Sequence, residues 1–178
     1  MRFLQTLSLK TYPSKMNVKG DIFEIDCDYV CQQCNCIAVK PHSLSFKIRS
    51  KLGVCPYSIR TAEGTKNLAI KIDRPALGSI SIIQSPVKNV KVVCMFAQYS
   101  YGKPGSYYYY ARNETFESRE NAFSKCLEEM EMIPKDAVIA FPYKIGCGEA
   151  GGKFENYLKM IKRFAKDRDG KVIIVDNT

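Results

Sequence analysis

The segment that decides the fold spans residues 141–157 and reads Phe141-Pro-Tyr-Lys-Ile-Gly-Cys-Gly-Glu-Ala-Gly-Gly-Lys-Phe-Glu-Asn-Tyr157. It joins a buried strand, predicted over residues 137–141, to an amphipathic helix predicted over residues 153–166. Glycines at such a junction let backbone amides approach an anion, and the helix adds its free N–H groups and positive dipole end. We therefore predict a phosphate-binding turn, with a turn that serves only chain reversal as the alternative.

Strands and helices alternate along the rest of the chain. Apolar and alternating patterns predict strands over residues 3–9, 15–25, 33–39, 90–98, 137–141 and 171–175, and a hairpin-like pair over residues 68–72 and 79–83. Helical spacing predicts helices over residues 41–52, 118–132 and 153–166. Strands separated by such helices indicate βαβ units. We expect a single α/β domain over residues 1–178, with three α/β/α layers around a mixed, largely parallel central sheet.

The composition is that of one globular domain and disfavours export or membrane insertion. Of the 178 residues, 46% are hydrophobic and 25% are charged. No apolar run approaches the roughly 18 to 20 residues of a membrane span, and no apolar signal-peptide core follows Met1. We therefore expect a monomer in the cytoplasm, or in the nucleus of a eukaryotic host cell, without a membrane partner.

Charge and cysteine content narrow the range of ligands. The 27 Lys and Arg residues against 18 Asp and Glu residues give a net charge of +9, which attracts phosphate-rich partners. Nucleic acid and an anionic small molecule both fit this charge. Cys27, Cys31, Cys34 and Cys36 lie close together without a second separated pair, so reduced, buried thiols are favoured over a zinc site. We expect no metal and no cofactor.

Two further stretches carry polar groups that suit a ligand. Asp21 either caps a turn or accepts a hydrogen bond from the exocyclic amine of a base. His42 is the only histidine and precedes Ser43 and Ser45 at a predicted helix start. It is either an exposed loop residue or a proton carrier in a ligand cleft.

A long loop follows the predicted strand over residues 90–98. It begins at Gln98 and contains Lys103, two glycines and several tyrosines. The tyrosines either pack on the surface of the fold or stack on a base or sugar. A loop at this position suits a lid over a ligand at the carboxyl edge of a parallel sheet.

Four motifs, taken in order, resemble those of the macro domain family. They are residues 17–22 (Asn-Val-Lys-Gly-Asp-Ile), the strand end at residues 35–36 (Asn-Cys), residues 95–98 (Met-Phe-Ala-Gln) and residues 142–152, which include Ile-Gly-Cys-Gly-x-Ala-Gly-Gly. The resemblance covers about residues 1–175. It is closest to the branch of ADP-ribose 1″-phosphate phosphatases and terminal ADP-ribose protein glycohydrolases, and it implies an ADP-ribose pocket at the carboxyl edge of the sheet.

The resemblance also implies roles for individual residues. Asp21 matches the aspartate that holds the adenine amine, with Ile22 beside it, and the loop over residues 35–46 lies against the distal ribose. The glycine turn wraps the diphosphate and the distal ribose. The expected ligand-binding residues are Asp21, Ile22, Asn35, Ser43, Ser45, Gln98, Lys103, Gly146, Cys147, Gly148, Ala150, Gly151 and Gly152.

Departures from the family pattern bear on catalysis. Residues 38–46 contain no glycine, Ala150 stands where the glycohydrolase branch has an acid, and Lys153 stands where relatives often have an aspartate. We therefore expect His42 and Glu149 to be the catalytic residues. The predicted function is binding of ADP-ribose or an ADP-ribosylated molecule and hydrolysis of a phosphate or ADP-ribosyl linkage at the distal ribose. A non-catalytic reader or sequestering protein and a basic nucleic-acid-binding domain are the alternatives.

Overall fold

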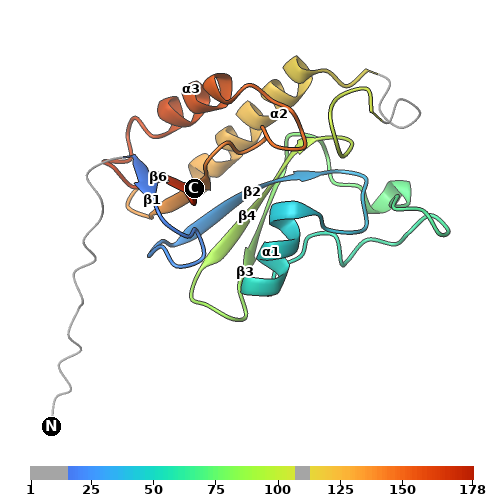
Figure 1. Ribbon diagram of the computed structural model, residues 1–178, viewed down its shortest axis with the longest axis horizontal. Helices are drawn as coiled ribbons and strands as arrows, with labels where there is room; N and C mark the ends of the chain where they lie inside the picture. Colours follow the sequence, from blue (N-terminus) through green and yellow to red (C-terminus); the bar gives the residue numbers. More distant parts are fainter. Residues whose placement is uncertain (1–15, 107–112) are drawn as a thin grey trace, which may run out of the picture.

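The computed structural model describes residues 16–106 and 113–178, so the strand predicted over residues 3–9 lies outside the described residues. Six strands form one sheet in the order β1-β6-β5-β2-β4-β3 (Figure 1). Every neighbouring pair is parallel except β3 with β4. The sheet is therefore mixed and largely parallel, as predicted. The strands are β1 Asn17–Lys19, β2 Tyr29–Asn35, β3 Ile80–Gln84, β4 Lys91–Gln98, β5 Ile139–Pro142 and β6 Val172–Asp176.

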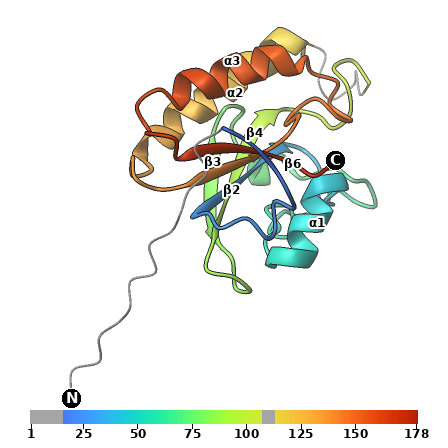
Figure 2. The ribbon, with the colours of Figure 1, turned by 60° about the vertical axis from the view of Figure 1, so that its left-hand side comes forward.

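Helices cover both faces of this sheet. Helices α2 (Phe116–Glu129) and α3 (Phe154–Phe164) lie side by side on one face, and α1 (Ser43–Leu52) lies on the other (Figures 1 and 2). Two short 3₁₀ helices span Lys71–Asp73 and Met130–Met132. The three-layer α/β/α arrangement is confirmed. Within the described ranges, the helices are too short or too polar to cross a membrane.

The sheet separates two apolar cores. On the α1 side, Val30 and Cys34 of β2 pack in the same core as Ile48 of α1. On the other side, Phe123 of α2 packs against Tyr157 of α3, with ring centroids 4.8 Å apart. Successive residues of a strand point to opposite faces, so β2 contributes to both cores. Burial on both faces explains why β4 is apolar between its two end residues.

The four clustered cysteines are divided between these cores. Cys27, Cys34 and Cys36 are buried on the α1 side, and Cys31 is buried on the side of α2 and α3. Because the sheet lies between them, the four thiols do not converge on one ion. Across residues 16–106 and 113–178, no three potential metal ligands gather at one point.

The strand predicted over residues 33–39 is wrong in extent. Strand β2 ends at Asn35, because Asn35 Oδ1 accepts hydrogen bonds from the amides of Ile37 and Ala38 at 3.2 and 2.7 Å. This side chain offers the backbone an alternative to the sheet ladder and turns it out of the sheet. The apolar residues that follow are buried beneath a loop.

The hairpin-like pair is also wrong. Strand β3 pairs antiparallel with β4, whereas Ala69 forms only an isolated bridge with Ala62 and is followed by a 3₁₀ turn. Leu68 and Ala69 are buried within a loop, so their apolar character reflects burial and not a strand. The strand predicted over residues 15–25 shortens to β1, after which Asp21 turns the chain.

The three predicted helices are present with small changes of extent. Helix α1 ends at Gly53, which has φ +67° and is suited to that left-handed position. Helix α2 begins at Phe116, before the predicted start, because Thr115 and Ser118 form a reciprocal capping box. Its capped start fixes the direction in which the preceding loop enters the helix.

Candidate functional site

The carboxyl ends of the parallel strands meet at one edge of the sheet, where a cleft opens. Asp21 follows β1, Asn35 ends β2, Gln98 ends β4 and Pro142 ends β5. Two cavities of about 660 and 920 Å³ lie at this edge. They adjoin and form one cleft because both are lined by Ser43, Leu44, Pro142 and Tyr143. We call the smaller the glycine cavity, after Gly146 and Gly148, and the larger the aspartate cavity, after Asp21.

The cleft brings together most of the predicted site residues. Asp21 and Ile22 line the aspartate cavity. The glycine cavity is lined by Asn35, His42, Ser43, Ser45, Gln98, Gly146, Gly148, Glu149 and Ala150. Four predicted ligand-binding residues line neither cavity: Lys103, Cys147, Gly151 and Gly152.

The start of α1 forms one wall of the cleft. The helix is preceded by His42, whose side chain makes no capping hydrogen bond, and its first turn contains no acid. The free amides of a first helical turn and the positive end of its dipole attract anions. From the sequence, we predicted that the start of α3 (Phe154–Phe164) would attract the anion, but none of the residues found to line either cavity belongs to α3. The helix terminus in the cleft is that of α1.

The buried side chain of Arg60 fixes the loop between β2 and α1. Its guanidinium donates to the carbonyls of Ala38 and Asn35 at 2.6 and 3.0 Å and lies 4.7 Å from the centroid of the Tyr57 ring. Asn67 Oδ1 accepts hydrogen bonds from two more amides of the loop, both at 3.0 Å. The loop that lacks glycine is therefore shaped by side chains packed beneath it.

Two glycines of the turn after β5 are required by close packing. Gly146 has φ +74°, and a Cβ at this position would lie 2.6 Å from Gln33 Oε1 and 2.7 Å from the ring of Tyr157. A Cβ on Gly152 would lie 2.7 Å from the Gly146 carbonyl oxygen. Part of the glycine pattern therefore serves the fold of the turn itself.

Of the other residues of the turn, Gly148 faces the cleft, whereas Gly151 and Cys147 face neighbouring parts of the chain. Gly148 lines the glycine cavity, and a Cβ there would meet nothing within 4 Å. Lys103 covers Gly151, so that a Cβ there would lie 2.9 Å from Lys103 Cγ. Cys147 bonds through Sγ to the Ile145 carbonyl at 3.2 Å, and burial raises the pKa of its thiol to about 11. The Cys147 side chain therefore turns back toward its own loop, and Gly148 is the open position.

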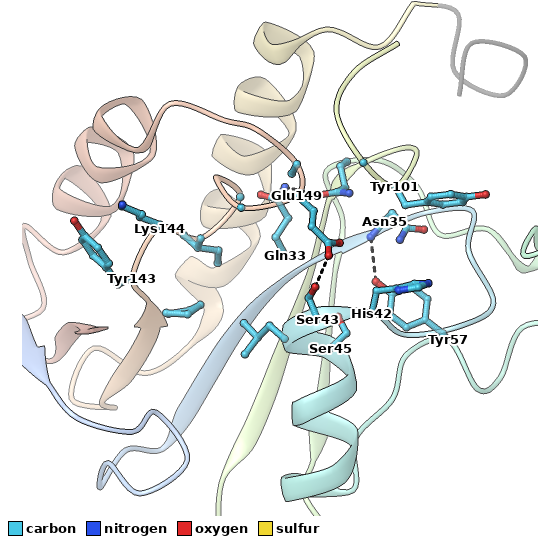
Figure 3. Close-up of a pocket in the computed structure, with 18 residues that line it drawn as sticks. Gln33, Asn35, His42, Ser43, Ser45, Tyr57, Tyr101, Tyr143, Lys144 and Glu149 are labelled. Carbon is cyan, nitrogen blue, oxygen red and sulfur yellow. Dashed lines mark hydrogen bonds between the residues drawn. The ribbon is translucent and has the colours of Figure 1, made fainter. Parts of the chain in front are cut away.

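A hydrogen bond spans the cleft between its two walls. Ser43 Oγ at the start of α1 donates to Glu149 Oε1 of the glycine turn at 2.6 Å (Figure 3). Ser43 has φ +47°, a left-handed conformation that is uncommon for a side chain other than glycine. We call this Ser43–Glu149 hydrogen bond the clasp.

Several residues that line the glycine cavity were not predicted from the sequence, and Gln33 and Tyr57 are two of them that form hydrogen bonds there. Gln33 Nε2 donates to Gln98 Oε1 at 2.7 Å, and the Asn35 amide donates to Tyr57 Oη at 3.3 Å. Gln32 and Gln33 interrupt the apolar residues of β2, and polar side chains within a buried strand are the sequence signal that could have pointed to Gln33 as a site residue. No local pattern indicates Tyr57, since it reaches the cavity only through the tertiary fold.

No protein family model matches the sequence, and no curated protein is significantly similar to it. Solved structures share its fold. The macrodomain of Mycobacterium tuberculosis DarG has a TM-score of 0.58 at 14% identity, over 94% of this chain and 97% of that chain. A macrodomain variant from Oceanobacillus iheyensis has a TM-score of 0.57 at 15% identity, over 90% of this chain and 81% of that chain. Thermosipho africanus DarTG in complex with ADP-ribose has a TM-score of 0.56 at 10% identity, over 89% of this chain and 39% of that chain. The chain has the macrodomain fold.

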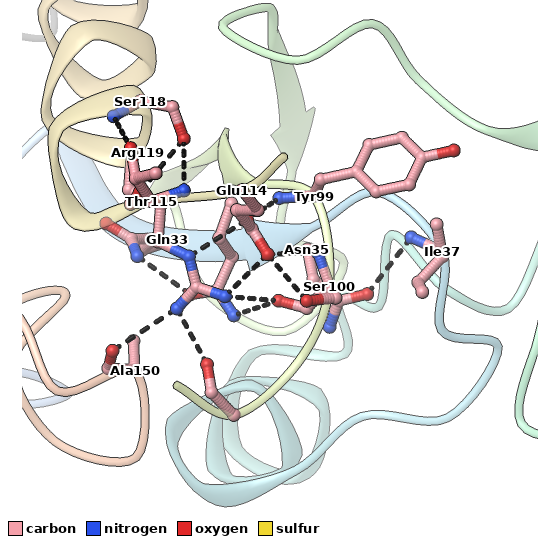
Figure 4. Close-up of polar contacts among 12 residues, drawn as sticks. Gln33, Asn35, Ile37, Tyr99, Ser100, Glu114, Thr115, Ser118, Arg119 and Ala150 are labelled. Carbon is pink, nitrogen blue, oxygen red and sulfur yellow. Dashed lines mark hydrogen bonds and ion pairs between the residues drawn. The ribbon is translucent and has the colours of Figure 1, made fainter. Parts of the chain in front are cut away.

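A buried ion pair joins two loops near the cleft. The side chains of Arg119 and Glu114 are 1% and 3% exposed, with Nη2 and Oε2 2.9 Å apart (Figure 4). Arg119 donates five hydrogen bonds, two to Glu114 and one to each of the carbonyls of Ser100, Gly102 and Ala150. Ala150 belongs to the glycine turn, and the other two carbonyls belong to the loop after β4. One side chain therefore sets the position of both loops.

Replacing Arg119 with methionine leaves the Glu114 carboxylate buried without its cation. We expect the free energy of unfolding in urea to fall by about 3–5 kcal/mol, because an uncompensated buried charge is strongly destabilising. The matched control is Lys135→Met, which removes exposed pairs with Glu131 and with Asp167, the second at 2.8 Å. That change should leave the free energy of unfolding almost unchanged, because exposed ion pairs contribute little. Equal losses of unfolding free energy in the two variants would show that the buried pair contributes no more to stability than an exposed pair.

The same pair predicts how stability depends on pH. Burial opposes ionisation of Glu114, but hydrogen bonds from Arg119, Ser100 and the Tyr99 amide, with the charge of Arg119, outweigh it and hold the pKa of this carboxyl below its usual 4.5. A lowered folded-state pKa contributes stability above the unfolded pKa, and this contribution is lost as pH falls through the folded pKa. We expect Glu114→Gln to flatten the loss of unfolding free energy below about pH 4.5. An unchanged slope in that variant would contradict the assignment.

Proposed function

We propose that the cleft binds ADP-ribose or a derivative of it, with the adenosine in the aspartate cavity and the distal ribose in the glycine cavity. The two-part cleft carries this proposal, because it has a carboxylate at one end, an anion-attracting helix terminus where the cavities meet, and a glycine turn along the second cavity. An extended ligand with an anionic centre and two polar ends matches that layout. Two proteins of the same fold, Thermosipho africanus DarTG and a Trypanosoma brucei macrodomain, were solved with ADP-ribose and with ADP, which supports this choice of ligand.

The aspartate cavity suits a purine. Asp21 Oδ1 accepts a hydrogen bond from the Phe23 amide at 3.0 Å, and we assign Oδ2 to the exocyclic amine of adenine. The rings of Phe46 and Tyr143 line the same cavity and are 59% and 40% exposed. Exposed aromatic rings at the rim of a cavity offer faces for stacking on a base.

The diphosphate belongs where the two cavities meet. Ser43 and Leu44 at the start of α1 line both cavities, and Gly148 opens into the glycine cavity from the opposite wall. Backbone amides from a helix start and from a glycine turn are the groups that hold phosphate oxygens in many folds. The net charge of +9 attracts such a ligand at long range.

The binding proposal predicts the effects of two substitutions, measured by calorimetry with ADP-ribose at protein concentrations well above micromolar. Gly148→Glu places a carboxylate against the diphosphate and should abolish detectable binding. Asp21→Asn keeps the oxygen that caps the turn but loses a charged acceptor, and should weaken binding at least about tenfold. Gly148→Ala is the control, since a Cβ there meets nothing within 4 Å and affinity should be kept.

Absence of heat with the wild-type protein would overturn the binding proposal. A polynucleotide ligand gives a different pattern, because its affinity falls steeply with salt and depends on scattered lysines. Tight binding of RNA or DNA that survives Gly148→Glu would support the nucleic-acid alternative instead.

We extend the proposal to hydrolysis at C1″ of the distal ribose. His42 and Glu149 both line the glycine cavity, where the proposed pose places that ribose. Water oxygen bonds to C1″ as the bond from C1″ to the leaving group breaks. Glu149 Oε2 accepts the proton of the water, since Oε1 is engaged by Ser43, and His42 gives a proton to the leaving group.

The hydrolytic step is tested with ADP-ribose 1″-phosphate and with ADP-ribosylated protein and nucleic acid as substrates. His42→Ala and Glu149→Gln should each lower kcat about 100-fold or more, because each removes a proton carrier. Glu128→Gln on the exposed face of α2 is the control, and its turnover should equal that of the wild type. Tight ADP-ribose binding without turnover of any substrate would reject hydrolysis and favour a non-catalytic reader.

A further inference from the structure

We infer that Glu149 selects ligands by their charge at the distal ribose. It favours an ADP-ribose whose C1″ carries a hydroxyl or an uncharged linkage over one whose C1″ carries a phosphomonoester. The inference rests on the proposed function, because it needs the distal ribose to lie in the glycine cavity. It narrows the substrate class to ADP-ribosyl groups joined through a bond other than a phosphomonoester.

The first supporting observation is that the carboxylate of Glu149 is held inside the cleft. The clasp fixes Oε1 at 2.6 Å from Ser43 Oγ, at the start of a ten-residue helix. The first turn of α1 contains no acid of its own, so Glu149 supplies negative charge at the positive end of the dipole. Figure 3 shows the Glu149 side chain reaching from the glycine turn toward Ser43. The negative charge of Glu149 therefore acts on any anion that lies in the glycine cavity.

The second observation concerns the cations near the glycine cavity. Among its described lining residues, Lys144 is the one lysine or arginine, and its Nζ lies over the Tyr143 ring, 5.4 Å from the centroid. Figure 3 shows it on the far side of the turn from Glu149. Lys103 lies against Gly151 outside the cavity, and Arg119 is buried with Glu114. The structure therefore places a carboxylate, and no facing ammonium or guanidinium, where a terminal phosphate would bind.

The size of the effect follows from Coulomb repulsion. ADP-ribose and its 1″-phosphate share the diphosphate and differ by about two negative charges at neutral pH. One unit charge at about 6 Å in a water-like medium changes an equilibrium roughly threefold, so two change it about tenfold. Because the cleft is open, salt should screen this repulsion.

The experiment is a calorimetric titration of both ligands into the wild-type protein and three variants, at low salt and at about 0.5 M salt. Glu149→Gln removes the charge but keeps an amide oxygen for Ser43. Ser43→Ala keeps the charge but removes the bond that holds it. Glu128→Gln makes the same change of net charge on α2, away from the cleft.

We expect the wild type and Glu128→Gln to bind ADP-ribose about tenfold more tightly than the 1″-phosphate at low salt, with a smaller ratio at high salt. Glu149→Gln should bring the ratio close to one by improving binding of the 1″-phosphate. Ser43→Ala should give an intermediate ratio, because the freed carboxylate can move away. A ratio near one in the wild type, or an unchanged ratio in Glu149→Gln, would overturn the inference.

The two proposals fail in distinguishable ways. If the wild type binds neither ligand, the proposed function is wrong and the inference falls with it. If ADP-ribose binds and Gly148→Glu abolishes it, but both ligands bind equally well, the proposed function stands and the role of Glu149 is rejected.

Discussion

The guanidinium of Arg119 is buried, and a buried cation is tolerated only when its N–H groups have acceptors. Here the acceptors are the carboxylate of Glu114 and three backbone carbonyls. Two of the carbonyls belong to the loop after β4, and the third, that of Ala150, belongs to the glycine turn. Each loop can therefore take only the positions that keep Arg119 paired. The capping box of Thr115 and Ser118 fixes the helix start that carries this pair, so α2 sets the shape of the cleft without lining it.

Arg60 likewise fixes a loop on the opposite wall of the cleft. It bonds to the carbonyls of Asn35, at the end of β2, and of Ala38, in the loop between β2 and α1. Arg168 is also buried and bonds to carbonyls around residue 133. Three of the basic residues counted in the net charge of +9 are thus internal and structural. These three side chains shape the loops and the core and are not available to a polyanion at the surface.

Much of the fold could be predicted from the sequence, because helix and strand periods and the glycine turn are local patterns. Asp21 after β1 and the glycines of the turn after β5 were named from such patterns. Other features depend on contacts between distant segments. Leu68 has the sequence pattern of a strand residue but is buried in a loop, and only the structure shows that Gly146 packs against Tyr157 whereas Gly148 is open. The pairing of Arg119 with Glu114 has no local sequence pattern, because Glu114 precedes α2 and the two residues lack the spacing of a helical ion pair.

The clasp joins two residues that lie far apart in the sequence. Ser43 lies in the stretch of residues 38–46 that contains no glycine and is the first residue of α1, and Glu149 lies in the glycine turn. In space, the two side chains bond to each other across the cleft. A glycine in place of Ser43 would leave the carboxylate without this partner, and an apolar residue in place of Glu149 would leave the hydroxyl without an acceptor. The two positions therefore act together and hold the negative charge of Glu149 between the two walls. Any anionic ligand of this cleft must either displace that carboxylate or lie beside it.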